Sequence, residues 1–180
     1  MDTNAQHARP RSFSRLETLT DADARRLGEL SLQLSPEARL DVRSLRKDIR
    51  RGTSSVFVLR SRSRIVASVT AARYSTPTGA HCHIEDVVVD SRHRGKGLGR
   101  KIMLAALAAL REMGVSHVEL TSRPSRVAAQ ALYRSLGFTP RETGVFELRM
   151  GETFSDRRRF GQTRVTPADR NTTPSQPAGA

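Results

Sequence analysis

Three glycines alternate where a valine-rich segment gives way to a long amphipathic one, and this stretch constrains the fold more than any other. Gly95, Gly97 and Gly99 lie between a predicted strand at residues 81–89 and a predicted helix that runs to about Met113. Glycines at such a turn let the backbone approach a ligand and point successive N–H groups into one concavity. These groups lie at the positive end of a helix dipole, which favours phosphate. The stretch therefore predicts a phosphate-binding loop.

Basic side chains surround this loop, as a ligand with several phosphates would require; they are Arg92, Arg94, Lys96, Arg100 and Lys101. Two other phosphate motifs do not fit. A P-loop needs Gly-x-x-x-x-Gly-Lys followed by Ser or Thr, which is absent. A dinucleotide fingerprint needs Gly-x-Gly-x-x-Gly, but Arg100 follows Gly99, and Glu119 lies mid-strand rather than at the end of a strand. A flexible basic turn is the remaining alternative.

Hydrophobic periodicity predicts the element order β-α-α-β-β-β-α-β-α-β. The predicted strands cover residues 13–19, 55–60, 65–74, 81–89, 117–121 and 145–150. The predicted helices run from a cap at Thr20 or Asp21 to Leu34, from a cap at Ser35 to Gly52, from the glycine loop to about Met113, and over residues 125–136. The strand–helix–strand unit at residues 84–121 is a crossover, which implies one parallel strand pair in a mostly antiparallel sheet. The predicted class is mixed α/β.

The two ends of the chain differ from its middle. Residues 1–12 and 151–180 are polar and lack apolar periodicity, so we expect two disordered tails around one domain at residues 13–150. Cys82 is the only cysteine, which excludes an internal disulfide. The longest apolar run, residues 102–110, falls far below the roughly 20 residues of a membrane span. With no signal peptide visible, we expect a cytoplasmic protein.

Two motifs resemble one known family. The run Arg94-Gly95-Lys96-Gly97-Leu98-Gly99 resembles the Arg/Gln-x-x-Gly-x-Gly/Ala signature of the GNAT superfamily of acetyltransferases. Downstream, Leu132-Tyr133-Arg134-Ser135-Leu136-Gly137-Phe138 resembles the Leu-Tyr-x-x-x-Gly-Phe signature of that family, at a matching distance. The strand that begins Ile84-Glu85-Asp86 is similar to that of the glucosamine-phosphate N-acetyltransferases. The resemblance covers residues 13–150.

The resemblance implies a fold and a co-substrate. The sheet would be mixed and mostly antiparallel, with one splayed parallel pair and helices on both faces. Acetyl-CoA would lie between the splayed strands, its pantetheine arm on the backbone of Val87, Val88 and Val89. Its pyrophosphate would lie on the loop of Arg94, Gly95, Lys96, Gly97, Leu98, Gly99 and Arg100. An acceptor amine would attack the thioester directly in a ternary complex, and a backbone N–H would polarise the thioester carbonyl.

The resemblance also suggests the acid and the base. Tyr133 matches the family tyrosine that protonates the coenzyme A thiolate, although a tyrosine that only packs is the alternative. Glu85 is the first candidate base and Asp86 the second, with a structural ion pair as the alternative. On a regular strand the two carboxylates face opposite sides, but a β-bulge would change this. Arg126 stands where many family members have Asn, and it could bind a phosphate instead.

Two further readings of the same strand carry less weight. His81 and His83 share a strand face with Glu85, but no further ligand stands at metal-binding spacing, so no metal site is predicted. A proton relay through His83 is an alternative. Cys82 has no partner base, which argues against an acyl-cysteine intermediate.

The acceptor is the least constrained part of the function. The chain carries a net charge of +13, nearly all of it from arginine. The second predicted helix presents a basic face that could attract an anionic amine acceptor or could be a solvated surface; it comprises Arg39, Arg43, Arg46, Lys47 and Arg50. We expect a small-molecule N-acetyltransferase, with a protein acetyltransferase or a nucleic-acid-binding module as alternatives, and a homodimer is possible. The chain has no Trp, two Tyr and six Phe. The basic segments therefore lack the interleaved aromatic residues expected of a protein that binds single-stranded nucleic acid.

Overall fold

The computed structural model describes residues 11–148, and these residues contain a sheet whose strands are ordered along the chain, β1-β2-β3-β4-β5. The strands are β1 (Arg11–Arg15), β2 (Ser54–Ser61), β3 (Arg64–Thr76), β4 (Gly79–Val89) and β5 (His117–Leu120). The first three neighbouring pairs are antiparallel, and β4 and β5 are parallel. This confirms the predicted mixed sheet with one parallel pair.

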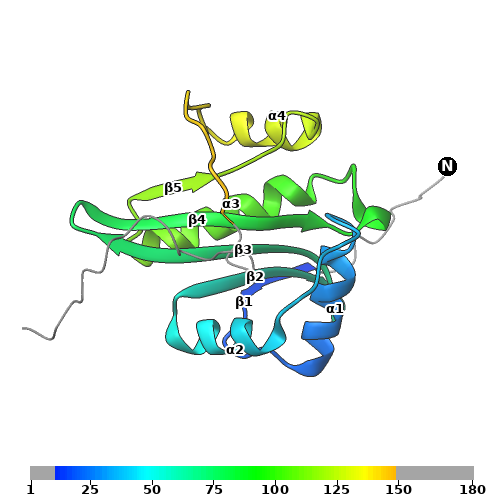
Figure 1. Cartoon of the computed structure of the whole chain (residues 1–180). Helices are drawn as coiled ribbons and strands as arrows, with labels where there is room; N and C mark the ends of the chain where they lie inside the picture. Colours follow the sequence, from blue (N-terminus) through cyan, green and yellow to red (C-terminus); the bar gives the residue numbers. More distant parts are fainter. Residues whose placement is uncertain (1–10, 149–180) are drawn as a thin grey trace, which may run out of the picture. The chain divides into compact units, whose positions relative to one another are not determined.

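Helices cover both faces of this sheet. The helices are α1 (Asp21–Ser31), α2 (Val42–Arg51), α3 (Leu98–Glu112) and α4 (Val127–Ser135), with a short 3₁₀ turn, η1 (Ser91–His93), before α3. Figure 1 shows α1 and α2 on one side of the sheet and α3 on the other. Because each face needs an apolar layer, the core divides in two. Phe57, Ile84 and Ile102 belong to the layer under α3, and Leu30, Val56 and Val88 belong to the layer under α1 and α2.

The second helix begins later than predicted. Ser35-Pro36 forms a turn in which the Ala38 N–H donates to the Ser35 carbonyl, and α2 starts only at Val42. The side chain of Asp41 accepts a hydrogen bond from the Ser44 N–H at 3.0 Å and caps the helix. Arg39 therefore lies outside the helix. Val42, Leu45 and Ile49 of α2 pack against the core, and Gly52 ends the helix at φ 71°.

Both boundaries of the first strand differ from the prediction. The first strand is Arg11–Arg15 rather than residues 13–19, because Arg11 and Ser12 pair with Ser61 and Arg60. The strand thus begins inside the segment predicted as a tail. Leu16 and Leu19, which follow it, are buried in the core instead of continuing the strand.

Among the described residues, 140–148 belong to a unit separate from that of residues 11–139. Residues 140–148 contain no helix or strand. The strand predicted at residues 145–150 is therefore wrong for residues 145–148, where Val145, Phe146 and Leu148 are exposed instead of paired in a ladder. Residues 149 and 150 lie outside the described part, as do residues 1–10 of the predicted N-terminal tail and the predicted tail at 151–180.

No helix among residues 11–148 is both long enough and apolar enough to cross a lipid bilayer.

Candidate active site

The pairing between the parallel strands β4 and β5 ends halfway along β4. Their ladder runs from His81 paired with His117 to Ile84 paired with Leu120. From there β4 continues to Val89, while β5 ends at Leu120. In the described part of the chain, residues 85–89 thus have a strand partner only on the β3 side. Backbone groups on the other side of this segment are available to a ligand that lies between the strands.

A β-bulge lies at the point where the strands part. Glu85 pairs with Thr70, and Val88 pairs with Ser68. Between these two pairs β4 therefore has one residue more than β3. Asp86 occupies the bulge with φ 48°, a left-handed conformation that Asp tolerates better than most residues. The bulge thereby re-aims the side chains that follow Glu85.

The glycine loop leaves open space at the N-terminus of α3. Gly95 has φ 72° and Gly97 has φ 70°, and a Cβ atom built on either would meet no atom within 4 Å. Gly97 is also the N-cap of α3, where no side chain caps the helix. Open space beside a helix N-terminus that no side chain caps is compatible with a pyrophosphate. Leu98 opens α3 with its side chain buried in the core, so only its backbone is available at the loop.

The basic side chains around this loop differ in the hydrogen bonds that they make within the protein. Arg92, Lys96 and Lys101 are exposed. Arg94 donates from Nε to the Val89 carbonyl at 3.0 Å. Arg100 donates to the Ser135 carbonyl at 3.1 Å and to its hydroxyl at 2.9 Å, which ties α3 to the end of α4. Arg92, Lys96 and Lys101 are therefore the readiest to meet phosphate.

Asp86, Arg126 and Tyr133 share one electrostatic neighbourhood. Desolvation raises the pKa of Asp86, although much of this residue is accessible to water, and the nearby charge of Arg126 opposes the rise. Desolvation likewise raises the pKa of Tyr133, again opposed by Arg126. Tyr133 is half-buried against the α3 layer, with its ring edge-on to Phe138 at 6.1 Å between centroids. A hydroxyl in this state keeps its proton at neutral pH, as a proton donor must.

Arg126 also reaches across to the segment after α1. Its guanidinium donates to the Leu34 carbonyl at 3.1 Å. This contact fixes the start of α4, and with it the helix that carries Tyr133.

Glu85 faces the opposite side of the sheet. Its partner Thr70 lies on the same face of β3 as Ser68, whose partner Val88 packs beneath α1 and α2. His83 lies on the same face. Its Nε2 is 3.4 Å from Glu85 Oε1, and its Nδ1 is 3.8 Å from Glu119 Oε1. The two candidate bases therefore have different neighbours, with Glu85 beside His83 and Asp86 near Arg126, whose charge also acts on Tyr133.

Sequence reasoning missed the polar neighbours of His83. The Tyr74 hydroxyl donates to Glu119 at 2.9 Å, which raises the pKa of Tyr74 and lowers that of Glu119. His81 stacks on Tyr74 at 5.5 Å and meets His117 at 5.1 Å between ring centroids. Only the strand register, Tyr74 opposite His81 and His83 opposite Glu119, reveals these contacts. Spacing along a single strand carries no such signal.

Neither metal nor thiol chemistry gains support from this cluster. Residues 11–148 hold no group of three His, Cys, Asp or Glu side chains that could bind a metal ion. Burial raises the pKa of the Cys82 thiol to about 11, which disfavours a reactive thiolate.

Comparison with known proteins identifies the domain. Residues 6–138 match the model of the acetyltransferase (GNAT) family. Mycothiol acetyltransferase from Thermobispora bispora is 51% identical over 53 residues, which make up 29% of this chain and 18% of that protein. The matched segments span less than half the length of the curated relatives.

Solved structures agree on the fold. An aminoglycoside acetyltransferase from an uncultured soil metagenomic sample, in complex with sisomicin, has a TM-score of 0.69 at 21% identity, over 79% of this chain and 97% of that one. Glucosamine-6-phosphate N-acetyltransferase from Arabidopsis thaliana gives 0.59 at 25% identity, over 76% and 98%. An acetyltransferase with acetyl-CoA from Clostridium acetobutylicum gives 0.63 at 16% identity, over 78% and 96%.

Proposed function

The chain belongs to the acetyltransferase (GNAT) family, and from this premise we propose that it transfers the acetyl group of acetyl-CoA to a primary amine of a small molecule. The observation that carries the proposal is the end of the β4–β5 ladder at Ile84, together with an open glycine loop at the N-terminus of α3. A long ligand with phosphates at one end and an amide-rich arm at the other suits this pair of features.

The binding residues follow from that arrangement. We propose that the backbone of Val87, Val88 and Val89 pairs with the pantetheine amides, because this segment of β4 lacks a partner on the β5 side. The pyrophosphate is proposed to lie on the loop from Arg94 to Gly99, where Gly95 and Gly97 leave space. Arg100 and Arg126 would contribute charge from α3 and α4, although both already donate to carbonyl groups.

The acid and the base are proposed to act from opposite faces of the sheet. Glu85 lies on the face of α1 and α2, where an acceptor amine could lose its proton to it directly or through a water molecule. Tyr133 packs against the layer on the other face, where its hydroxyl could protonate the departing thiolate. The nucleophile would then approach from one side and the leaving group depart on the other. Asp86, second in line as base, would mainly hold Arg126 near Tyr133.

The names of the relatives support a small-molecule acceptor. Mycothiol, an aminoglycoside and glucosamine 6-phosphate appear in the names of three similar proteins, and all are small molecules. An anionic acceptor remains part of the proposal because Arg43, Lys47 and Arg50 are exposed on α2. A cytoplasmic location and a homodimer also belong to the proposal; cell fractionation and light scattering would test them.

Thiol release from acetyl-CoA tests the proposal most directly. The full chain would be assayed with amino sugars and their phosphates, with aminoglycosides and with lysine peptides. Turnover with a small amine, together with binding of coenzyme A by calorimetry, is the expected result. Turnover confined to peptides would move the function to a protein acetyltransferase. Failure to bind coenzyme A would overturn the proposal altogether.

A further inference from the structure

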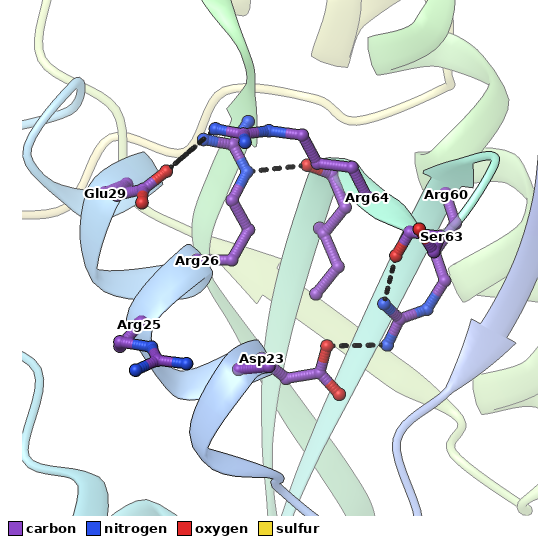
Figure 2. Close-up of a pocket in the computed structure, with 9 residues that line it drawn as sticks. Asp23, Arg25, Arg26, Glu29, Arg60, Ser63 and Arg64 are labelled. Atoms are coloured by element: carbon purple, nitrogen blue, oxygen red, sulfur yellow. Dashed lines mark hydrogen bonds and ion pairs between the residues drawn. The ribbon is translucent and has the colours of Figure 1, made fainter.

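A buried ion pair joins helix α1 to the residue at which the phosphate loop begins. Arg26 in α1 is 8% exposed and Asp90, directly after β4, is 5% exposed. The guanidinium of Arg26 donates to Asp90 Oδ2, to the Ile65 carbonyl at 2.8 Å and to Glu29 at 2.7 Å. Figure 2 shows this side chain between Glu29 and the backbone of β3. Such complete engagement holds both side chains in one position.

Asp90 uses its second carboxylate oxygen to shape the loop. Oδ1 accepts the Arg92 N–H at 3.0 Å and caps η1, and the Asp90 carbonyl accepts the His93 N–H at 2.8 Å. Desolvation alone would raise the pKa of Asp90, but the hydrogen bonds from Arg26 and from the Arg92 N–H outweigh it and lower that pKa. One carboxylate thus connects α1 to the first turn before Gly95.

The end of α1 makes a second tie to the same turn. Gln33, two residues after α1, accepts the Ser91 N–H on its Oε1 at 2.9 Å. Residues 90–92 are therefore positioned by the α1 segment at two successive points.

We propose that Arg26 and Asp90 are positioning residues for the coenzyme pyrophosphate, holding the loop open before the coenzyme arrives. This inference rests on the proposed function. The charge of Arg26 is met by Asp90 and Glu29, so Arg26 acts through the loop and not as a phosphate ligand. When only part of the population has the loop in the binding geometry, the apparent affinity falls by that fraction.

A neighbouring ion pair provides the matched control. Asp23 of α1 pairs with Arg60 of β2 at 2.8 Å, with side chains 13% and 23% exposed. Arg26 lines the same cavity of about 260 Å³ as Asp23 and Arg60, drawn in Figure 2. Arg60 also donates to the Ser63 carbonyl at 3.0 Å. Because the Asp23 pair joins α1 to β2 and does not reach the phosphate loop, its loss should affect stability alone.

The experiment compares Asp90→Asn with Asp23→Asn in the full chain. Calorimetry would measure the Kd of coenzyme A, and turnover would be followed with acetyl-CoA and with S-acetylpantetheine, which has no pyrophosphate. If about one molecule in ten keeps the loop in place, Asp90→Asn raises the Kd of coenzyme A about tenfold. S-acetylpantetheine should keep its kcat/KM, and Asp23→Asn should leave both readouts unchanged.

Two further variants protect the test against misfolding. Arg26→Gln combined with Asp90→Asn leaves no unpaired buried charge and should show the same selective loss. Gln33→Ala removes an exposed side chain and should show a smaller loss of the same kind. An unchanged Kd in these variants, or an equal loss with S-acetylpantetheine, would overturn the inference. A wild-type chain that fails to bind coenzyme A would instead refute the proposed function.

Discussion

Ile84 and Val88 lie four residues apart in β4, yet they pack into opposite layers of the core. Ile84 belongs to the layer beneath α3, and Val88 belongs to the layer beneath α1 and α2. In a regular strand residues four apart share a face. The extra residue at Asp86 reverses the alternation of the residues that follow it, so that Val88 lies on the same face of the sheet as Glu85. The bulge thus sets which face each residue of β4 presents beyond Glu85, at the point where the ladder with β5 ends.

Replacing Asp86 should show how much the bulge depends on its backbone conformation. Asp86 has φ 48°, which Asn tolerates and a β-branched residue does not. Asp86→Val should therefore be less stable to urea than Asp86→Asn by about 1–2 kcal/mol. Equal stability of the two variants would show that the bulge relaxes without strain.

The pH dependence of the Asp86→Asn variant should reveal the desolvation of this carboxyl. Its pKa is raised above 3.8, so the folded state binds the proton more tightly than the unfolded state and is less stable once Asp86 ionises. Asp86→Asn cannot ionise and should be more stable than wild type at neutral pH. This advantage should shrink as the pH falls through the raised pKa and vanish below 3.8. Thermal unfolding at several pH values measures it; a gain that persists in acid would contradict the assignment.

Tyr133→Phe tests the proposed acid. The substitution keeps the ring that packs beside Phe138 and removes only the hydroxyl. We expect kcat to fall by roughly 100-fold, in line with general-acid catalysis, while the melting temperature and the Kd of coenzyme A stay unchanged. Stopped assays of acetylated product would measure the fall. An undiminished kcat would leave Tyr133 as a packing residue.

Glu85→Gln tests the proposed base. The loss of rate should be largest at neutral pH and smallest at high pH, where the acceptor is already a free amine. Glu112→Gln, at the far end of α3, removes a carboxylate of the same kind and should leave the pH–rate profile unchanged. A loss of equal size at every pH would point to a structural role for Glu85, for example through its contact with His83.

Local signals carried most of what could be predicted from the sequence. The glycine loop, the crossover and the two signatures depend on residues near one another along the chain. The structure confirms the parallel pair, and the phosphate-binding role of the loop stays a prediction. The predicted start of α2 was wrong because Ser35 and Asp41 are both residue types that favour the N-cap position. Residue type alone does not decide between them.

Contacts between distant residues escaped prediction. Gln33 and Ser91 lie 58 residues apart, and Arg26 and Asp90 lie 64 apart. No periodicity along the chain links such pairs, because they meet only when α1 packs on the sheet. The roles of the site residues remain predictions that the variants above would decide.

The basic face of α2 gives the last prediction. Arg46 donates to the Leu19 carbonyl at 3.0 Å and pairs with Asp21, so it holds α2 against the start of α1. Arg43 and Arg50 are exposed, and their spacing of two helical turns puts them on one side of α2.

If Arg43 and Arg50 attract an anionic acceptor, Arg43→Glu combined with Arg50→Glu should raise the KM of that acceptor about tenfold at low salt, and the effect should fade as salt screens it. Turnover of a neutral amine should not change. Arg46→Gln is the control; it should lower the melting temperature and leave the salt dependence of kcat/KM intact. Loss of salt-sensitive DNA or RNA binding in the double variant, with acetyl transfer untouched, would instead assign this face to nucleic acid. If neither assay responds, the face is a solvated surface and the acceptor need not be anionic.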